Sequence, residues 1–117
     1  MGLFDWLFGP KVAQISVQEA HDLLKGNNPP LIVDVRQPEE TKAGIVAKAV
    51  LLPLPDLDRR MEELPRERPI LLICRSGNRS QTAARKLAKA GYEVQNVAGG
   101  MMAWDSARLP VRVSKKR

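Results

Sequence analysis

Cys74 is the only cysteine among the 117 residues and the side chain best suited to covalent chemistry. It follows the apolar run "ILLI" and precedes "RSGNRS", a segment that contains a glycine and two arginines. Such a loop can turn successive backbone N–H groups inward around an anion, and a following helix adds the positive end of its dipole. These features favour a thiolate, so we expect a reactive thiol with a lowered pKa. The alternative is a buried structural cysteine, because free cysteines are often buried.

The length of this loop bears on what Cys74 attacks. A thiolate in an anion-binding loop suits either phosphoryl chemistry or transfer of a sulfur atom. Phosphatases place an arginine six positions after the nucleophile, whereas here Ser80 occupies that position and Arg79 comes one residue earlier. The shorter loop favours a persulfide sulfur over a phosphate, which leaves a phosphatase or arsenate reductase as the least favoured alternative. The predicted binding loop comprises Arg75, Ser76, Gly77, Asn78, Arg79 and Ser80.

The elements that must position Cys74 follow from apolar runs and helix signals. Strands are predicted at about residues 11–16, 31–35, 50–54, 69–74 and 92–97. Helices are predicted at 17–26 after a Ser16–Glu19 capping box, at 57–64 capped by Asp56, at 79–91, and from 99 onward. Short apolar strands alternating with helices predict an α/β fold, an open parallel five-stranded sheet with helices on both faces. Cys74 then ends a central strand, at the edge where such sheets bind ligands.

Composition narrows the function further. The net charge of +6 favours anionic ligands, but the five aromatic side chains form no stacking stripe, so no nucleic-acid partner is expected. A lone cysteine excludes an internal disulfide, and the chain has no Cys/His cluster, so neither a metal nor a cofactor is expected. The chain has no apolar run of the ~18 residues needed for a membrane span and no signal peptide, which together predict a cytoplasmic protein.

The chain ends differ in character from the predicted domain at residues 11–113. Residues 1–10, "MGLFDWLFGP", form an apolar segment that could contact a membrane or a partner protein. Docking of this segment on its own domain or on a second copy is favoured slightly over those contacts. Residues 114–117 form a basic tail that is expected to be frayed.

Four motifs recur here in the order and spacing of a known family. They are "VDVRQPEE" at 33–40, "CRSGNRS" at 74–80, the helix that begins "SQTAARKL", and "VAGGMMAW" at 97–104. Over about residues 12–113 the chain therefore resembles the single-domain sulfurtransferases of the rhodanese superfamily. The resemblance implies that Cys74 attacks the outer sulfur of a small anionic donor such as thiosulfate and becomes a persulfide. Cyanide or a thiol would then accept that sulfur.

The resemblance also assigns roles around Cys74. Backbone N–H groups from Arg75 to Arg79 would hold the transferred sulfur, and the two arginines would attract the anionic donor. Asp34 and Arg36 would be supporting residues that pair near the loop. Gly99, Gly100 and Trp104 would be architectural.

One segment departs from the family pattern. The family usually has Gly-His-Ile-x-Gly-Ala where this chain has "GIVAKA", so Ile45 replaces the histidine and Lys48 replaces the second glycine. A solvated surface role is favoured for Lys48 over a partner contact. Because no second cysteine can discharge a persulfide, the acceptor must be external: cyanide, a small thiol or a cysteine of a partner protein. The alternative function is a sulfur carrier or interaction module with little free turnover.

Overall fold

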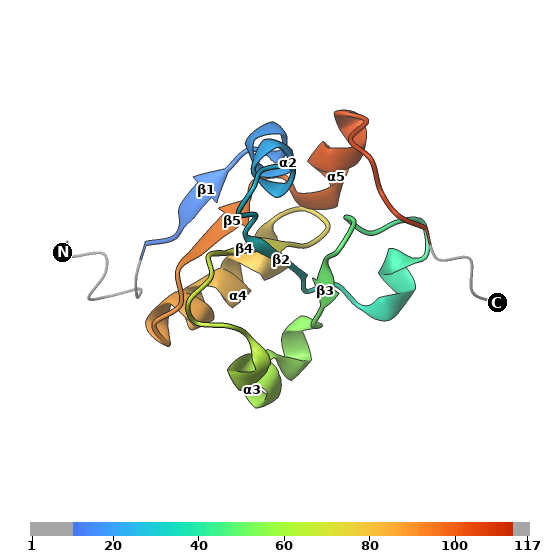
Figure 1. Ribbon diagram of the computed structural model, residues 1–117. Helices are drawn as coiled ribbons and strands as arrows, with labels where there is room; N and C mark the ends of the chain where they lie inside the picture. Colours follow the sequence, from blue (N-terminus) through green and yellow to red (C-terminus); the bar gives the residue numbers. More distant parts are fainter. Residues whose placement is uncertain (1–10, 114–117) are drawn as a thin grey trace.

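The computed structural model describes residues 11–113, and the chain forms one sheet in the order β1-β5-β4-β2-β3 (Figure 1). All neighbouring strands in this order are parallel. The prediction of an α/β fold with an open, parallel, five-stranded sheet is therefore confirmed. The strands are β1 (Ala13–Ile15), β2 (Leu31–Asp34), β3 (Val50–Leu51), β4 (Ile70–Ile73) and β5 (Val94–Val97).

Helices cover both faces of the sheet, as the sequence predicts. The helices α2 (Val17–Leu24) and α5 (Gly100–Ser106) pack with one core, and α3 (Leu57–Arg60) and α4 (Asn78–Lys89) pack with the other. In Figure 1 the two pairs lie above and below the strands. Three short 3₁₀ helices complete the described elements, at Pro38–Thr41, Leu54–Asp56 and Met61–Glu63.

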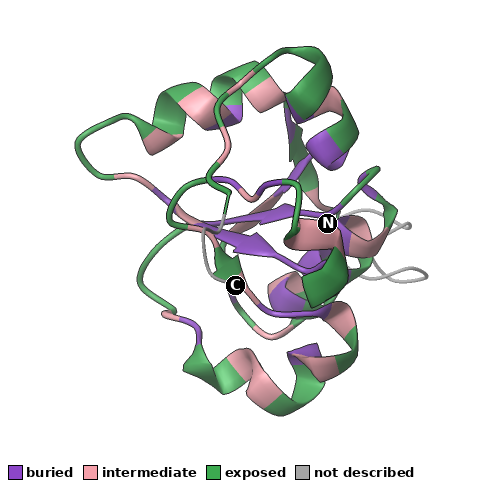
Figure 2. Cartoon of the chain, turned by 90° about the vertical axis from the view of Figure 1, so that its right-hand side faces the viewer, coloured by how far each residue is buried: buried purple, intermediate pink, exposed green. Residues whose placement is uncertain are grey.

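The central strand β4 explains how one apolar run serves two cores. Its side chains alternate between the faces, so Ile70 and Leu72 join the α3/α4 core while Leu71 and Ile73 join the α2/α5 core. All four are fully buried, and Figure 2 shows buried strands between helices whose outer surfaces are exposed. A strand buried on both faces holds its last residues rigidly, and Cys74 comes directly after it.

The predicted capping box is confirmed, and Asp56 occupies the N-cap position of α3, but its side chain does not cap the helix. Ser16 accepts a hydrogen bond from the Glu19 N–H group, and the Glu19 carboxylate accepts one from the Ser16 N–H group. Asp56 makes no capping hydrogen bond, because Leu54–Asp56 already forms a 3₁₀ turn and its backbone is helical rather than extended. Its carboxylate instead pairs with Arg59 at 3.1 Å.

The segment that departs from the family pattern has its own contacts. Ile45 forms an isolated antiparallel bridge with Arg112, with N–O distances of 3.0 and 2.7 Å. Lys48 is exposed, as favoured, and adopts a left-handed backbone with φ of 67°.

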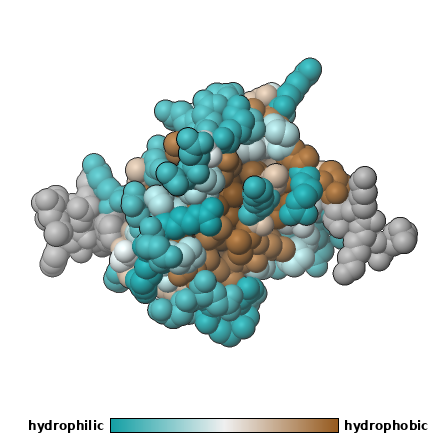
Figure 3. Space-filling view, viewed as in Figure 1, coloured by the Kyte–Doolittle hydropathy of each residue, from teal (hydrophilic) through white to brown (hydrophobic). Residues whose placement is uncertain are grey.

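The face in Figure 3 carries apolar surface in its middle, where β2 and β3 lie in Figure 1, bordered by hydrophilic side chains.

The predictions for residues 1–10 and 114–117 lie outside the described residues. Within residues 11–113, no helix combines the length and the apolar character that crossing a bilayer requires.

Candidate active site

The sulfur of Cys74 lies at the carboxyl end of β4, surrounded by hydrogen-bond donors of the loop that follows. The Gly77 N–H group donates to Sγ at 3.1 Å, and the Ser80 N–H group donates at 3.3 Å. The Ser80 hydroxyl is a third donor, at 3.3 Å. Cys74 is 1% exposed, and Ser80 is fully buried. The thiol therefore combines the burial of a structural cysteine with the donor set of a reactive one.

These contacts change the acidity of the thiol in opposite directions. Burial is the largest single influence and raises the pKa of Cys74, because a thiolate loses hydration. The Ser80 hydroxyl and the N–H groups of Ser80, Gly77 and Ser76 lower it, since each stabilises negative charge on sulfur. Together the donors outweigh burial, and the pKa of Cys74 lies below its ordinary value. The geometry thus favours a thiolate.

Further donors of the loop are unused. In the described part of the chain, the N–H groups of Arg75, Asn78 and Arg79 have no hydrogen-bond acceptor. The latter two belong to the first turn of α4, where N–H groups lack intrahelical partners. Gly77 precedes this turn with φ of +107°, a backbone conformation suited to glycine. The loop can therefore bind negative charge beyond the cysteine sulfur itself.

The start of α5 fixes the loop from the other side. The Met101 N–H group donates to the Cys74 carbonyl at 2.8 Å, and the Met102 N–H group donates to the Arg75 carbonyl at 3.0 Å. This approach requires Gly100, whose φ is +55°, because a Cβ atom there would lie 2.6 Å from the Arg75 oxygen and against the Cys74 oxygen. The glycine motif after β5 therefore permits close contact between two backbones.

Asp34 and Arg36 form a buried ion pair next to this region. Arg36 Nη2 lies 2.8 Å from Asp34 Oδ2, and Arg36 Nε lies 3.0 Å from both carboxylate oxygens. Arg36 also donates to the carbonyls of Glu40 at 2.8 Å and Gly44 at 3.0 Å. The pair thus holds the chain segment after β2 in place, in keeping with the pairing that the resemblance implies.

Arg79, to which the resemblance assigns attraction of the anionic donor, lies in an ion pair with Glu40. Its guanidinium forms two hydrogen bonds with the Glu40 carboxylate, at 2.6 and 2.7 Å, so much of its positive charge is balanced. The hydrogen bond from Arg79 is the main reason why the pKa of Glu40 falls from 4.5 to about 2. Glu40 ends the motif "VDVRQPEE", but nothing in the sequence pairs it with a residue 39 positions away. Arg75, in contrast, is exposed, and its side chain forms no ion pair within residues 11–113.

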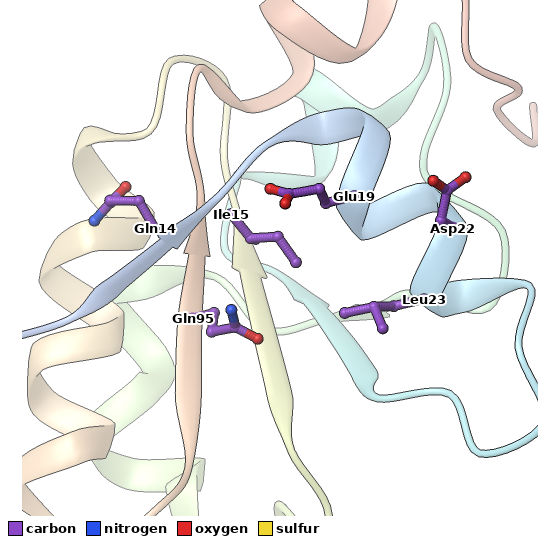
Figure 4. Close-up of a pocket in the computed structure, with 6 residues that line it drawn as sticks. All are labelled: Gln14, Ile15, Glu19, Asp22, Leu23 and Gln95. Carbon is purple, nitrogen blue, oxygen red and sulfur yellow. The ribbon is translucent and has the colours of Figure 1, made fainter.

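A separate groove lies away from the cysteine. It has a volume of about 490 Å³ and lies between β1, α2 and β5 (Figure 4). Its lining carries carboxylates and amides but no nucleophile. The residues are Gln14, Ile15, Glu19, Asp22, Leu23 and Gln95. The groove therefore offers no group for covalent chemistry, and the donors around Cys74 identify the candidate active site.

Comparison with known proteins agrees with this arrangement. A sulfurtransferase of Allochromatium vinosum is 36% identical over 101 residues, which cover 86% of this chain and 94% of the relative. The protein YtwF of Bacillus subtilis is 32% identical over 100 residues, covering 86% and 97% of the two chains. The crystal structure of a rhodanese-related protein from Thermoplasma volcanium matches with a TM-score of 0.82 at 27% identity, covering 87% of this chain and 99% of that one.

The profile of the family described as Rhodanese-like domain matches residues 16–107, which include β2, the Cys74 loop and α5. With its parallel sheet and the donors around Cys74, the chain belongs to the rhodanese-like domain family.

Proposed function

We propose that this protein is a sulfurtransferase that carries a sulfur atom on Cys74 as a persulfide. The observation that carries the proposal is the ring of three donors on Sγ, from Gly77 and from the backbone and hydroxyl of Ser80, at 3.1 to 3.3 Å. A sulfur atom held in this way is nucleophilic as a thiolate and remains solvated by fixed dipoles as it reacts. The sulfurtransferase relative from Allochromatium vinosum supports the same reaction class.

The proposed chemistry balances without a cofactor. The Cys74 thiolate attacks the outer sulfur of thiosulfate, a new S–S bond forms, and the bond to the sulfonate sulfur breaks to release sulfite. Cys74 then carries a persulfide anion, whose outer sulfur would accept hydrogen bonds from the unused N–H groups of Asn78 and Arg79. Attack on the outer sulfur by cyanide gives thiocyanate, and attack by a thiolate gives a new persulfide; each step regenerates the Cys74 thiolate.

The surroundings of the loop favour sulfur over phosphate. Phosphoryl transfer needs strong positive charge on the oxygens of the transferred group. Arg79, the loop arginine before Ser80, donates instead to Glu40, and at the next position the Ser80 hydroxyl faces Sγ. An anionic sulfur donor needs less positive charge around the transferred atom. The backbone N–H groups and the exposed guanidinium of Arg75 attract the donor without having to bind three phosphoryl oxygens.

Transfer of sulfur from thiosulfate to cyanide tests the proposal. The wild-type protein is expected to form thiocyanate, and mass spectrometry after treatment with donor alone should show one added sulfur atom on Cys74. Cys74→Ser should abolish both signals while retaining the fold by circular dichroism. Thiocyanate formation that persists in Cys74→Ser would overturn the mechanism.

The burial of Cys74 supports a second candidate, a sulfur carrier that serves a dedicated partner. With 1% of Cys74 exposed and no second cysteine in the chain, a partner protein's thiolate would have to reach into the loop to accept the sulfur. A carrier is expected to take up one sulfur per chain yet release it slowly to cyanide and small thiols. Rapid multiple turnover with a small acceptor would exclude this candidate.

A further inference from the structure

A polar cluster with the buried Asn96 of β5 at its centre lies directly behind the active loop. Asn96 is only 3% exposed, because β5 runs between two other strands of the sheet. Its Nδ2 atom lies 3.3 Å from the Gly77 carbonyl oxygen and 3.0 Å from the side-chain oxygens of both Gln14 and Gln81. A second bond, from Gln14 Nε2 to Gln81 Oε1 at 2.7 Å, closes the cluster. The cluster thus connects β1, β5 and α4 to one backbone atom of the active loop.

The orientation of the Asn96 amide follows from its surroundings. The Gly77 carbonyl oxygen can only accept a hydrogen bond, so the amide atom that faces it must be the nitrogen. The other amide atom, Asn96 Oδ1, is buried and has no hydrogen-bond partner among the described residues. An unpaired buried polar atom costs about 1–3 kcal/mol. An apolar side chain would suit a strand buried within the sheet better, so stability alone does not explain asparagine here.

The contact with Gly77 supplies another explanation. Gly77 has φ of +107°, its N–H group donates to Cys74 Sγ at 3.1 Å, and its carbonyl also accepts a bond from the Gln81 N–H group at 3.1 Å. Glycine adopts positive and negative φ about equally readily, so its own preference does not hold the N–H group on the sulfur. The two bonds to its carbonyl fix the peptide group that follows Gly77, so a change in φ or ψ of Gly77 between this group and its N–H group would strain or break them.

We propose that Asn96 is a positioning residue of the active loop. By donating from Nδ2 to the Gly77 carbonyl, it holds the Gly77 N–H group on the sulfur of Cys74. Nδ2 has two hydrogens, so while one points to Gly77, the side-chain oxygens of Gln14 and Gln81 share the other and orient the amide. The effect on the thiolate is independent of any sulfur donor, whereas the corresponding effect on the persulfide rests on the proposed function.

The test measures the pKa of Cys74 from the pH dependence of its alkylation by iodoacetamide. In Asn96→Ala the Gly77 N–H group is released, and we expect the pKa to rise by about half a unit to one unit, since part of a hydrogen bond to a charged group is lost. In Asn96→Asp the rise should be larger, because a carboxylate oxygen would face the Gly77 oxygen and add negative charge near the thiolate. Gln95→Ala is the matched control: Gln95 precedes Asn96 on β5 and lines the separate groove of Figure 4.

The outcomes separate positioning from a merely structural role. If Asn96→Ala lowers the melting temperature but leaves the pKa of Cys74 as in wild type, or changes it no more than Gln95→Ala does, the proposal is overturned. Failure of both Asn96 variants to fold would also overturn it, because Asn96 would then act through global stability. If the pKa rises as expected while the wild-type protein accepts sulfur from no donor, the proposed function fails and the positioning role of Asn96 stands.

Discussion

Removal of the Ser80 hydroxyl should raise the pKa of Cys74. Ser80→Ala deletes the only side-chain donor on Sγ among the described residues and leaves the N–H groups of Gly77 and Ser80 in place. Ser80 is fully buried, and within residues 11–113 its hydroxyl has no other hydrogen-bond partner, so the substitution deprives only the sulfur of a partner. The change therefore isolates one contribution to the acidity of the thiol.

The size of the effect follows from the strength of that contact. A hydrogen bond to a charged group contributes about 1.5–3 kcal/mol, and one pKa unit corresponds to about 1.36 kcal/mol. Two N–H donors remain and can take up part of the charge, so we apply the lower end of the range. The pKa of Cys74 should rise by about one unit. At a pH below the pKa of Cys74 in both proteins, the thiolate fraction and the alkylation rate of Ser80→Ala should be about tenfold lower than those of wild type.

Alkylation by iodoacetamide as a function of pH measures this pKa directly. Thr82→Ala is the matched control, because Thr82 lies on the same helix, and its hydroxyl donates to the Asn78 carbonyl at 3.4 Å without contacting Cys74. The control should titrate as wild type does. An unchanged or lowered pKa in Ser80→Ala would refute the assignment of the hydroxyl as a thiolate donor.

The same substitution should alter how stability depends on pH. The pKa of Cys74 lies below its ordinary value of 9.0 in the folded chain, so the folded state binds the proton less tightly than the unfolded state. The resulting stability is fully present above pH 9.0 and is lost as the pH falls through the folded pKa. Ser80→Ala brings the folded pKa of Cys74 closer to its ordinary value. Between neutral and alkaline pH, the unfolding free energy of the variant should therefore rise less than that of wild type.

Three further predictions concern Asp34, Lys48 and the Glu40–Arg79 pair. Asp34→Asn should lower the unfolding free energy in urea by about 3 kcal/mol, because it leaves the buried Arg36 charge without its partner; a loss below ~1 kcal/mol would contradict this. Lys48→Gly should stabilise the protein by up to ~1 kcal/mol in the same assay by relieving a left-handed backbone, whereas Lys48→Ala should not. The unfolding free energy of wild type should fall by up to ~1 kcal/mol as the pH falls from 4.5 toward about 2, because Glu40 is protonated and its bond to Arg79 weakens. Glu40→Gln should lack this change, and an identical dependence of unfolding free energy on acid pH in both proteins would contradict the prediction.

The parts of the fold that the sequence predicts well are those fixed by local patterns. The run Ile70–Ile73 is apolar throughout and forms a strand buried on both faces. Gly91, with φ of +98°, follows α4 where the sequence predicts that the helix ends. Asp56 shows the limit of such signals. Its residue type suits a helix cap, but the preceding Leu-Pro favours a 3₁₀ turn that occupies the same backbone.

Contacts between distant segments account for what the sequence does not show. The loop after Cys74 is contiguous, so its donors can be anticipated from glycine, serine and a following helix. Glu40 reaches the loop from the 3₁₀ helix after β2, and Asn96 reaches it from β5. Their residue types alone do not distinguish a surface carboxylate or a turn amide from a partner of the site. Only the strand order, which places β2 and β5 on either side of β4, brings them together.

The contacts of the loop also make Cys74 an intrinsic reporter of the native state. Its carbonyl is bound by Met101, and the Arg79–Glu40 pair spans 39 residues, so none of this environment survives in an unfolded chain. Unfolding converts an acidic, enclosed thiol into an exposed one of ordinary pKa. A small reagent in mildly acidic solution should therefore label folded molecules preferentially, while a bulky thiol reagent in alkaline solution should label unfolded ones. The two labels together would count both populations in one sample without a probe being introduced.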